Sequence, residues 1–299
     1  MLHPARFEGV FPVLATPLTP DEEVDEESLR RLIRRVLDAD VNGVVILGSA
    51  GEGPILSETA RRKVIEVVAV EVNGRVPVVV GTGDTSTKRT IENNRAAARE
   101  GMDAALVVPP YYFPMNPQAV ERFYRELAED GSLPIIVYNI PQLTKISISL
   151  ETARVLSGVE GIIGIKDSSG DFAFFQRLVC EAKSESFRIF QGRAALSFVS
   201  LVFGADGTMD PMGNIDPKLG VELYDAVKRG DWHAARECQV KLMSLASVIG
   251  YGPYPVCTGL KAVLSLEGIC GPTVTSPMPS LTGGELEGVR KKLGELGLI

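Results

Sequence analysis

Short apolar segments recur through the first 209 of the 299 residues, and segments with helical periodicity separate them. Several apolar segments are continuous rather than alternating, such as VVIL at 44–47 and IIVY at 135–138. A continuous apolar run favours a strand that is covered on both faces, as in a parallel sheet. The predicted strands lie in residues 10–16, 43–49, 76–83, 104–110, 134–140, 162–168, 187–192 and 205–209.

The segments between them have the spacing of amphipathic helices. Residues 28–37 read SLRRLIRRVL, in which apolar positions recur three and four residues apart. Residues 57–72 open with Ser57 and Glu58, a capping residue followed by an acidic first turn. A strand, a helix and a further parallel strand form a right-handed crossover of about 30 residues. Further helices are predicted at 85–100, 117–130, 149–156, 172–182 and 193–203.

Eight such units predict an α/β fold, a closed (β/α)8 TIM barrel. A doubly wound open sheet is the alternative, but no Gly-rich dinucleotide fingerprint follows the first strand segment. After residue 209 the strand pattern stops, and the sequence predicts only helices. We therefore predict two parts, a barrel at residues 1–224 that carries the functional site and a C-terminal helical subdomain at residues 225–299. The predicted C-terminal helices lie at 218–229, 232–249, 259–266 and 284–296.

Charge and composition exclude several classes of function. The formal net charge is −7, so we expect no nucleic acid or anionic membrane as a partner, since both attract basic surfaces. No apolar stretch reaches transmembrane length and the first residues lack the apolar core of a signal peptide, so we expect a cytoplasmic protein. The four cysteines lie far apart and only His3 and His233 are histidines. We therefore expect free thiols, no metal site and no His-based triad.

Lys166 ends an apolar segment and precedes a turn of Asp, Ser, Ser and Gly. Lysine is rarely buried, so this position needs a reason. One interpretation is an ion pair, or a side chain whose amine reaches water at the end of the strand. The other is a buried amine in its nucleophilic form, which can attack a carbonyl and form a Schiff base. In a (β/α)8 barrel the functional site lies at the C-terminal ends of the strands, where Lys166 is expected.

Two further features fall at the same predicted edge. The second strand segment ends in GSAGEG at 48–53, a loop of small residues whose N–H groups can hold an anion, although such loops are more often tight turns. Tyr138 ends the fifth segment, where a lone tyrosine is more often a core residue with a satisfied hydroxyl. A lysine, a tyrosine and an anion-binding loop at one barrel mouth together suit a 2-oxo acid.

A series of short motifs extends this pattern over nearly the whole chain. In order they are GVFP at 9–12, TPL at 16–18, GSAGE at 48–52, PYY at 110–112, YNIP at 138–141, GIKD at 164–167 and GADG at 204–207. With these motifs the chain resembles the class I aldolases typified by dihydrodipicolinate synthase and N-acetylneuraminate lyase. The resemblance implies a Schiff-base lyase without cofactor that takes pyruvate and an aldehyde. It also implies a homo-oligomer, a dimer of dimers.

The resemblance implies a role for each matching residue. Lys166 would condense with the ketone of pyruvate or a longer 2-oxo acid. Tyr138 would carry the proton during imine formation and during cleavage or formation of the carbon–carbon bond. Ser49 would be the hydroxyl of the proton relay, and the N–H groups of Ser49 and Ala50 would hold the substrate carboxylate. Tyr112 matches a tyrosine that enters a neighbouring subunit's site.

Two more positions are candidates for substrate contact by the same resemblance. Met209 matches a position whose backbone lies near bound pyruvate. Ser168 is a candidate for binding a substrate hydroxyl, because related sugar-acid aldolases use a hydroxyl there.

The chain also departs from the motifs of both dihydrodipicolinate synthase and N-acetylneuraminate lyase. The synthases bind the second substrate's carboxylate with an arginine five residues after the tyrosine, and here that position is Leu143, which has no paired donors. The second hydroxyl of the 48–53 loop is replaced by Ala50. The neuraminate lyases carry acidic residues after the seventh strand, whereas residues 192–195 read GRAA. Arg193 either meets an anionic substrate tail or faces solvent at the start of a helix.

These departures favour a 2-keto-3-deoxy sugar acid or 4-hydroxy-2-oxoglutarate as the substrate. A dihydrodipicolinate synthase that condenses pyruvate with aspartate semialdehyde is the first alternative. A non-catalytic 2-oxo acid binding protein on an inherited barrel is the second, and the presence of both Lys166 and Tyr138 argues against it.

Overall fold

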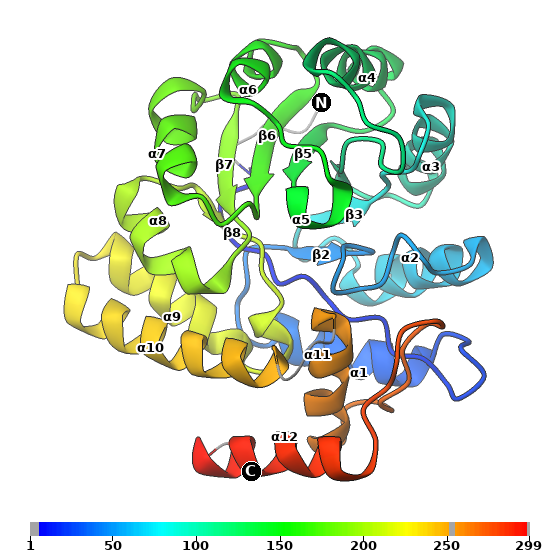
Figure 1. The fold of residues 1–299 in the computed structure, drawn as a ribbon, viewed down its shortest axis with the longest axis vertical. Coiled ribbons are helices and arrows are strands. Elements are labelled where there is room, and N and C mark those ends of the chain that lie inside the picture. Colours follow the sequence, from blue (N-terminus) through cyan, green and yellow to red (C-terminus); the bar gives the residue numbers. More distant parts are fainter. Residues whose placement is uncertain (1–5, 251–254, 298–299) are drawn as a thin grey trace. The chain divides into compact units, whose positions relative to one another are not determined.

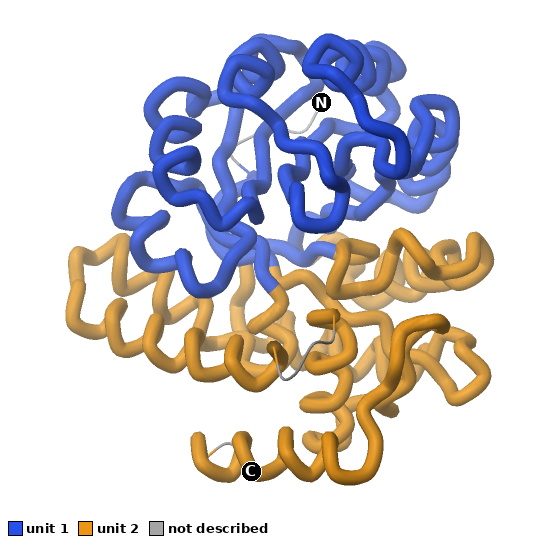
Figure 2. The backbone as a smooth tube through the Cα atoms, in the orientation of Figure 1, with its two compact units in different colours: residues 1–11, 42–45, 76–210 blue, residues 12–41, 46–75, 211–299 orange. Residues whose placement is uncertain are grey.

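The computed structural model describes residues 6–250 and 255–297, and His3 therefore lies outside the described residues (Figure 1). The chain divides into two compact units, which Figure 2 shows in different colours. The first unit comprises residues 1–11, 42–45 and 76–210, and it holds nearly all of the sheet. The second comprises residues 12–41, 46–75 and 211–299. The predicted boundary between residues 224 and 225 stays a prediction.

Eight parallel strands form the sheet, in the order β1-β8-β7-β6-β5-β4-β3-β2. This arrangement confirms the predicted α/β barrel class, and all strands except β1 lie inside the predicted segments. The strands are β1 (Gly9–Val10), β2 (Val44–Ile46), β3 (Val78–Gly81), β4 (Ala104–Val107), β5 (Ile135–Asn139), β6 (Ile162–Asp167), β7 (Arg188–Gln191) and β8 (Gly207–Thr208).

The two ends of this strand order are joined at Asn42, which precedes β2. Its N–H donates to the carbonyl of Val10 at 3.0 Å, and its side-chain oxygen accepts the N–H of Val10 at 2.8 Å. A Cβ on Gly9 would lie 2.1 Å from that side-chain oxygen, so β1 can approach Asn42 only with glycine at this position. The sheet therefore curls until β1 is hydrogen-bonded to the residue that precedes β2, as in a (β/α)8 barrel.

Strand β1 is shorter than the sequence predicts. Phe11 still donates its N–H to the carbonyl of Thr208 at 2.9 Å, but Pro12 follows and has no N–H to continue the ladder. The proline thus limits β1 to two residues of regular strand.

The helices of the first unit alternate with its strands. Ser86, Asn116, Ser149 and Asp171 cap four of them by accepting a first-turn N–H with a side-chain oxygen. The short helix α5 follows β5 directly and was not predicted. The helices are α3 (Thr87–Arg99), α4 (Pro117–Asp130), α5 (Pro141–Thr144), α6 (Leu150–Ser157), α7 (Phe172–Glu181) and α8 (Ser197–Phe203), with a 3-10 turn η2 (Ala194–Leu196).

The second unit is mainly helical, and its last four helices match the predicted C-terminal helices. No described helix is long and apolar enough to cross a membrane. All four cysteines are free, as predicted. The elements are α1 (Glu26–Leu37), α2 (Glu58–Val72), η3 (Met212–Asn214), α9 (Pro217–Lys228), α10 (Trp232–Ile249), α11 (Val256–Leu266) and α12 (Gly283–Glu295).

Candidate functional site

Lys166 and Tyr138 lie opposite one another on the paired strands β6 and β5. Residues paired in this way point to the same face of the sheet. The Nζ atom of Lys166 lies 4.1 Å from the centre of the Tyr138 ring. Both residues are buried, with exposed fractions of 2% and 5%. The structure therefore brings the two principal candidates together at the carboxyl end of the sheet.

The amine of Lys166 has no carboxylate within ion-pair distance in residues 6–250 and 255–297. Its burial excludes a side chain that reaches bulk water, and the missing carboxylate excludes an ion pair within this part of the chain. Both structural interpretations of this lysine therefore fail. What remains is a buried amine beside a phenol, an arrangement suited to attack on a carbonyl carbon.

A one-residue shift in the strand pairing sets this opposition. Ile135 pairs with Ile162, but the next residue of β5, Ile136, pairs with Gly164. Without the shift, Tyr138 would stand opposite the residue before Lys166, and the lysine would point to the other face. On its other side Gly164 allows β6 to approach β7, because a Cβ on it would lie 2.5 Å from the carbonyl oxygen of Arg188 in β7. The irregularity is therefore part of how the site is built.

One residue further along, Asn139 and Asp167 are joined on the opposite face of the same strand pair. The Nδ2 atom of Asn139 donates to Oδ1 of Asp167 at 2.7 Å, and the hydroxyl of Ser169 donates to Oδ2 at 2.9 Å. Burial raises the pKa of the Asp167 carboxyl, and the donors from Asn139 and Ser169 oppose that shift. Asn139 also accepts the N–H of Ile148 at 3.0 Å. These bonds hold β5 and β6 in the register that sets Tyr138 beside Lys166.

Gly192, directly after β7, leaves room for two candidate side chains. Its N–H donates to the carbonyl of Asp167 at 2.8 Å, which brings its backbone close to β6. A Cβ on Gly192 would lie 2.0 Å from Oγ of Ser168 and 2.9 Å from Cε of Lys166. The hydroxyl of Ser168 is buried and has no hydrogen-bond partner. Leaving such a group unpaired is costly, so this hydroxyl has capacity to bind a ligand.

Met209 and Arg193 lie on segments that follow the last two strands. Met209 is fully buried after β8, and its N–H donates to the carbonyl of Gln191 at 2.8 Å. Arg193 is exposed, and its guanidinium lies 3.6 Å from where a Cβ of Gly170 would stand. Within the described residues no carboxylate lies at ion-pair distance from this guanidinium.

Tyr112 and Leu143 are both exposed in the single chain. The exposed fraction is 85% for Tyr112 and 61% for Leu143, which lies in α5. Tyr112 has φ 90°, in the left-handed region that residues with a side chain seldom occupy, and its ring packs edge-on against Phe113 at 5.0 Å. Neither residue contributes to the buried cluster around Lys166.

The loop after β2 belongs to the second unit. The carbonyl of Gly48 accepts the N–H of Gly51 at 3.0 Å, and the carbonyl of Ser49 accepts the N–H of Glu52 at 3.3 Å. No described residue accepts a hydrogen bond from the N–H of Ser49 or of Ala50. Two successive N–H groups without partners have the character of an anion-binding nest, which fits the role the sequence predicts for this loop.

Sequence reasoning did not identify Gly192 or the Asn139–Asp167 bond as parts of the site. A signal for the bond exists, because each of the two residues directly follows a predicted site residue at the end of an apolar strand. No comparable signal marks Gly192, because its importance depends on how closely β7 approaches β6.

We predict that Gly192→Ala destabilises the protein by about 1–3 kcal/mol, the usual cost of overpacking a filled interior. Gly284→Ala is the matched control, because nothing lies within 4 Å of the added Cβ there, and it should not lower stability. Adding Ser168→Ala to Gly192→Ala should recover part of the loss by removing the nearest clashing atom. Urea unfolding of the four proteins measures this, and a Gly192→Ala protein as stable as the unmodified chain would contradict the packing described.

The model of the dihydrodipicolinate synthetase family matches residues 6–296. A 4-hydroxy-tetrahydrodipicolinate synthase of Methanopyrus kandleri is 37% identical over 298 residues, which are 98% of each chain. An uncharacterized DapA-like lyase of Halobacterium salinarum is 34% identical over 296 residues, which are 99% of this chain and 96% of that one.

The solved structures that this chain resembles include members of the same family. The dihydrodipicolinate synthase of Thermotoga maritima has a TM-score of 0.93 and 31% identity, and the match covers 98% of this chain and 100% of that one. YagE is a prophage protein of E. coli K12 that belongs to the dihydrodipicolinic acid synthase family and was solved in complex with pyruvate. It has a TM-score of 0.93 and 28% identity, with coverage of 98% and 99%.

The family model and the relatives span nearly the whole chain, including the strand that carries the buried lysine. The expectation drawn from the motifs is therefore confirmed. The chain belongs to the dihydrodipicolinate synthetase family, and it is an enzyme of that family's kind, a class I aldolase that acts as a carbon–carbon lyase.

Proposed function

We propose that this enzyme forms or cleaves a 2-oxo acid with pyruvate as one half, through a Schiff base on Lys166. The observation that carries the proposal is the buried Lys166 amine, without a carboxylate partner in the described chain and 4.1 Å from the Tyr138 ring. The E. coli relative solved in complex with pyruvate supports pyruvate as the common substrate.

In the proposed mechanism the Nζ atom of Lys166 attacks the ketone carbon of pyruvate, and loss of water from the resulting carbinolamine gives the imine. Removal of a proton from the methyl carbon gives an enamine, which attacks the aldehyde carbon. Hydrolysis of the new imine then releases the product and the free amine, and cleavage follows the same steps in reverse. Tyr138 carries the proton in these steps, since its hydroxyl donates to no described residue.

The proposal assigns the pyruvate carboxylate to the N–H groups of Ser49 and Ala50. Their lack of partners in the described chain supports this role. The hydroxyl of Ser49 joins Tyr138 in the proton relay, and the backbone of Met209 contacts pyruvate. The proposed reaction needs no metal or other cofactor, because the imine itself withdraws electrons from the reacting carbon.

We further propose a cytoplasmic homo-oligomer, a dimer of dimers, in which Tyr112 enters the site of a neighbouring subunit. The 85% exposure of Tyr112 and its rare backbone conformation support a role outside its own chain. One solved relative is described as a monomeric dihydrodipicolinate synthase variant, so assembly differs among relatives. The four free cysteines support a reducing compartment.

For the natural substrate we propose a 2-keto-3-deoxy sugar acid or 4-hydroxy-2-oxoglutarate. The exposed Leu143 offers no donors for a second carboxylate, whereas the buried hydroxyl of Ser168 has unused hydrogen-bonding capacity that a substrate hydroxyl can fill. Arg193 is the candidate for the second carboxylate of 4-hydroxy-2-oxoglutarate, because its guanidinium has no carboxylate partner in the described chain.

A second candidate is 4-hydroxy-tetrahydrodipicolinate synthase, which condenses pyruvate with aspartate semialdehyde. The name of the Methanopyrus kandleri relative, at 37% identity, favours it. In this alternative a cationic side chain at a position other than 143 binds the carboxylate of aspartate semialdehyde.

Borohydride reduction in the presence of pyruvate tests the Schiff base. We expect one covalent adduct, which peptide mapping places on Lys166, because the reduced imine is stable. Lys261 is a matched control within the same protein, since it is equally buried but ion-paired. Lys166→Arg should abolish both the adduct and turnover. An adduct on Lys261 or another lysine, or an active protein without one, would overturn the assignment.

Aldehyde preference tests the substrate. Charge-assisted hydrogen bonds contribute about 1.5–3 kcal/mol each, so a missing bidentate pair lowers kcat/KM by roughly two to four orders of magnitude. We therefore expect condensation of pyruvate with glyceraldehyde or glyoxylate to exceed that with aspartate semialdehyde. Leu143→Arg should improve aspartate semialdehyde selectively, whereas the control Leu143→Met should not. If aspartate semialdehyde is the best of the three aldehydes in the unmodified enzyme, the second candidate is correct.

A further inference from the structure

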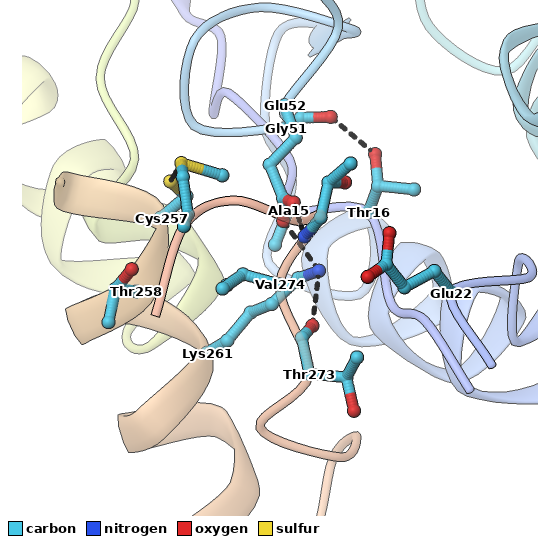
Figure 3. Close-up of polar contacts among 12 residues, drawn as sticks. Ala15, Thr16, Glu22, Gly51, Glu52, Cys257, Thr258, Lys261, Thr273 and Val274 are labelled. Carbon is cyan, nitrogen blue, oxygen red and sulfur yellow. Dashed lines mark hydrogen bonds and ion pairs between the residues drawn. The ribbon is translucent and has the colours of Figure 1, made fainter. Parts of the chain in front are cut away.

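Glu52 and Lys261 form an ion pair inside the second unit that the proposed mechanism does not use. Their Oε1 and Nζ atoms are 2.5 Å apart, and both side chains have an exposed fraction of 0%. Figure 3 shows Lys261 extending from α11 toward the 273–274 segment, with the Gly51–Glu52 turn nearby. The two residues lie far apart in the sequence, so only the folded chain reveals the pair.

Stability alone is a weak reason to bury such a pair. Removing two charges from water is costly, and their attraction often only offsets that cost. Burial lowers the pKa of the Lys261 ammonium, and the charge of Glu52 opposes the shift. An apolar pair of similar volume would fill the same space without this penalty, so the charges suggest a positional role.

The ion pair is bonded into a fixed frame. Nζ of Lys261 donates to the carbonyl of Thr273 at 2.7 Å (Figure 3). Oε2 of Glu52 accepts the N–H of Thr275 at 2.7 Å. Both partners therefore hold the same short segment as well as each other. These hydrogen bonds fix the orientations of the Glu52 carboxylate and the Lys261 ammonium, which an ion pair alone would not do.

The same frame fixes the anion-binding loop. Glu52 has φ 60° in the left-handed region, and its N–H donates to the carbonyl of Ser49 at 3.3 Å. The carbonyl of the preceding Gly51 accepts the hydroxyl of Thr16 at 2.7 Å. A Cβ on Gly51 would lie 2.7 Å from the carbonyl oxygen of Leu14, so the turn has little room to move. The direction of the Ser49 and Ala50 N–H groups depends on this turn.

We propose that Glu52 and Lys261 are positioning residues that orient the Ser49 and Ala50 N–H groups for the substrate carboxylate. The inference rests on the proposed function, since it assumes that pyruvate binds this loop. It gives helix α11 an indirect part in substrate binding, because Lys261 acts through the 48–53 loop and α11 itself touches no substrate.

The test is the double variant Glu52→Gln with Lys261→Met, compared with each single variant. The glutamine side chain can still accept the N–H of Thr275, and the methionine side chain has a similar volume to that of lysine. Each single change leaves one charge or donor buried without its partner and should lower the unfolding midpoint more than the double change does. In the double variant we expect the pyruvate concentration for half-maximal borohydride trapping on Lys166 to rise about ten- to a hundredfold. We expect kcat at saturating pyruvate to stay within about threefold.

The control is the double variant Arg35→Met with Glu267→Gln, which removes a less buried ion pair at the end of the same helix α11. It should leave half-maximal trapping unchanged. A folded Glu52→Gln/Lys261→Met protein with unchanged half-maximal trapping would overturn the inference. An equal rise in the control variant would also overturn it, by showing a general effect of weakening α11.

The outcomes separate this inference from the proposed function. If the unmodified enzyme gives no adduct on Lys166, the proposed function fails before any variant is compared. If the unmodified enzyme is trapped normally and the double variant behaves like it at every pyruvate concentration, only the positioning role fails.

Discussion

The pairing of β5 with β6 is the constraint on which the proposed chemistry of this enzyme depends. Parallel strands place paired residues on one face, and a slip of one residue reverses the faces. The pairing changes by one residue between Ile135 and Ile136, and only after this shift does Tyr138 stand opposite Lys166. The hydrogen bond between Asn139 and Asp167, one residue further on, secures the register. The proposed nucleophile, Lys166, and the proposed proton carrier, Tyr138, are thus held in place by backbone pairing.

The site is surrounded by groups whose burial has an energetic cost. The Lys166 amine lacks a carboxylate partner in the described chain, and the buried Ser168 hydroxyl lacks a hydrogen-bond partner. Stability alone would favour apolar residues at these positions. The proposed substrate accounts for both groups, since a hydroxylated 2-oxo acid offers a ketone to the amine and a hydrogen-bond partner to the Ser168 hydroxyl.

The sequence predicts the fold better than it predicts the site's geometry. The continuous apolar runs locate all eight strands because a strand covered on both faces leaves a local signal, and the capping residue Ser57 locates the start of α2. Lys166 and Tyr138 are identifiable because a polar residue ending an apolar strand is unusual. The strand shift at Ile136, the space beside Gly192 and the Glu52–Lys261 pair depend on distant segments and leave no local pattern.

The most direct measurement of the central claim is the behaviour of Tyr138→Phe, because this change removes only the hydroxyl and keeps the ring that packs over Lys166. At saturating pyruvate the variant should still be trapped on Lys166 by borohydride, with a wild-type unfolding midpoint. Its kcat should fall by about 10²- to 10⁴-fold, the usual contribution of a positioned acid–base group. A folded variant with wild-type kcat would contradict the claim that the register of β5 and β6 exists to place this hydroxyl beside the amine.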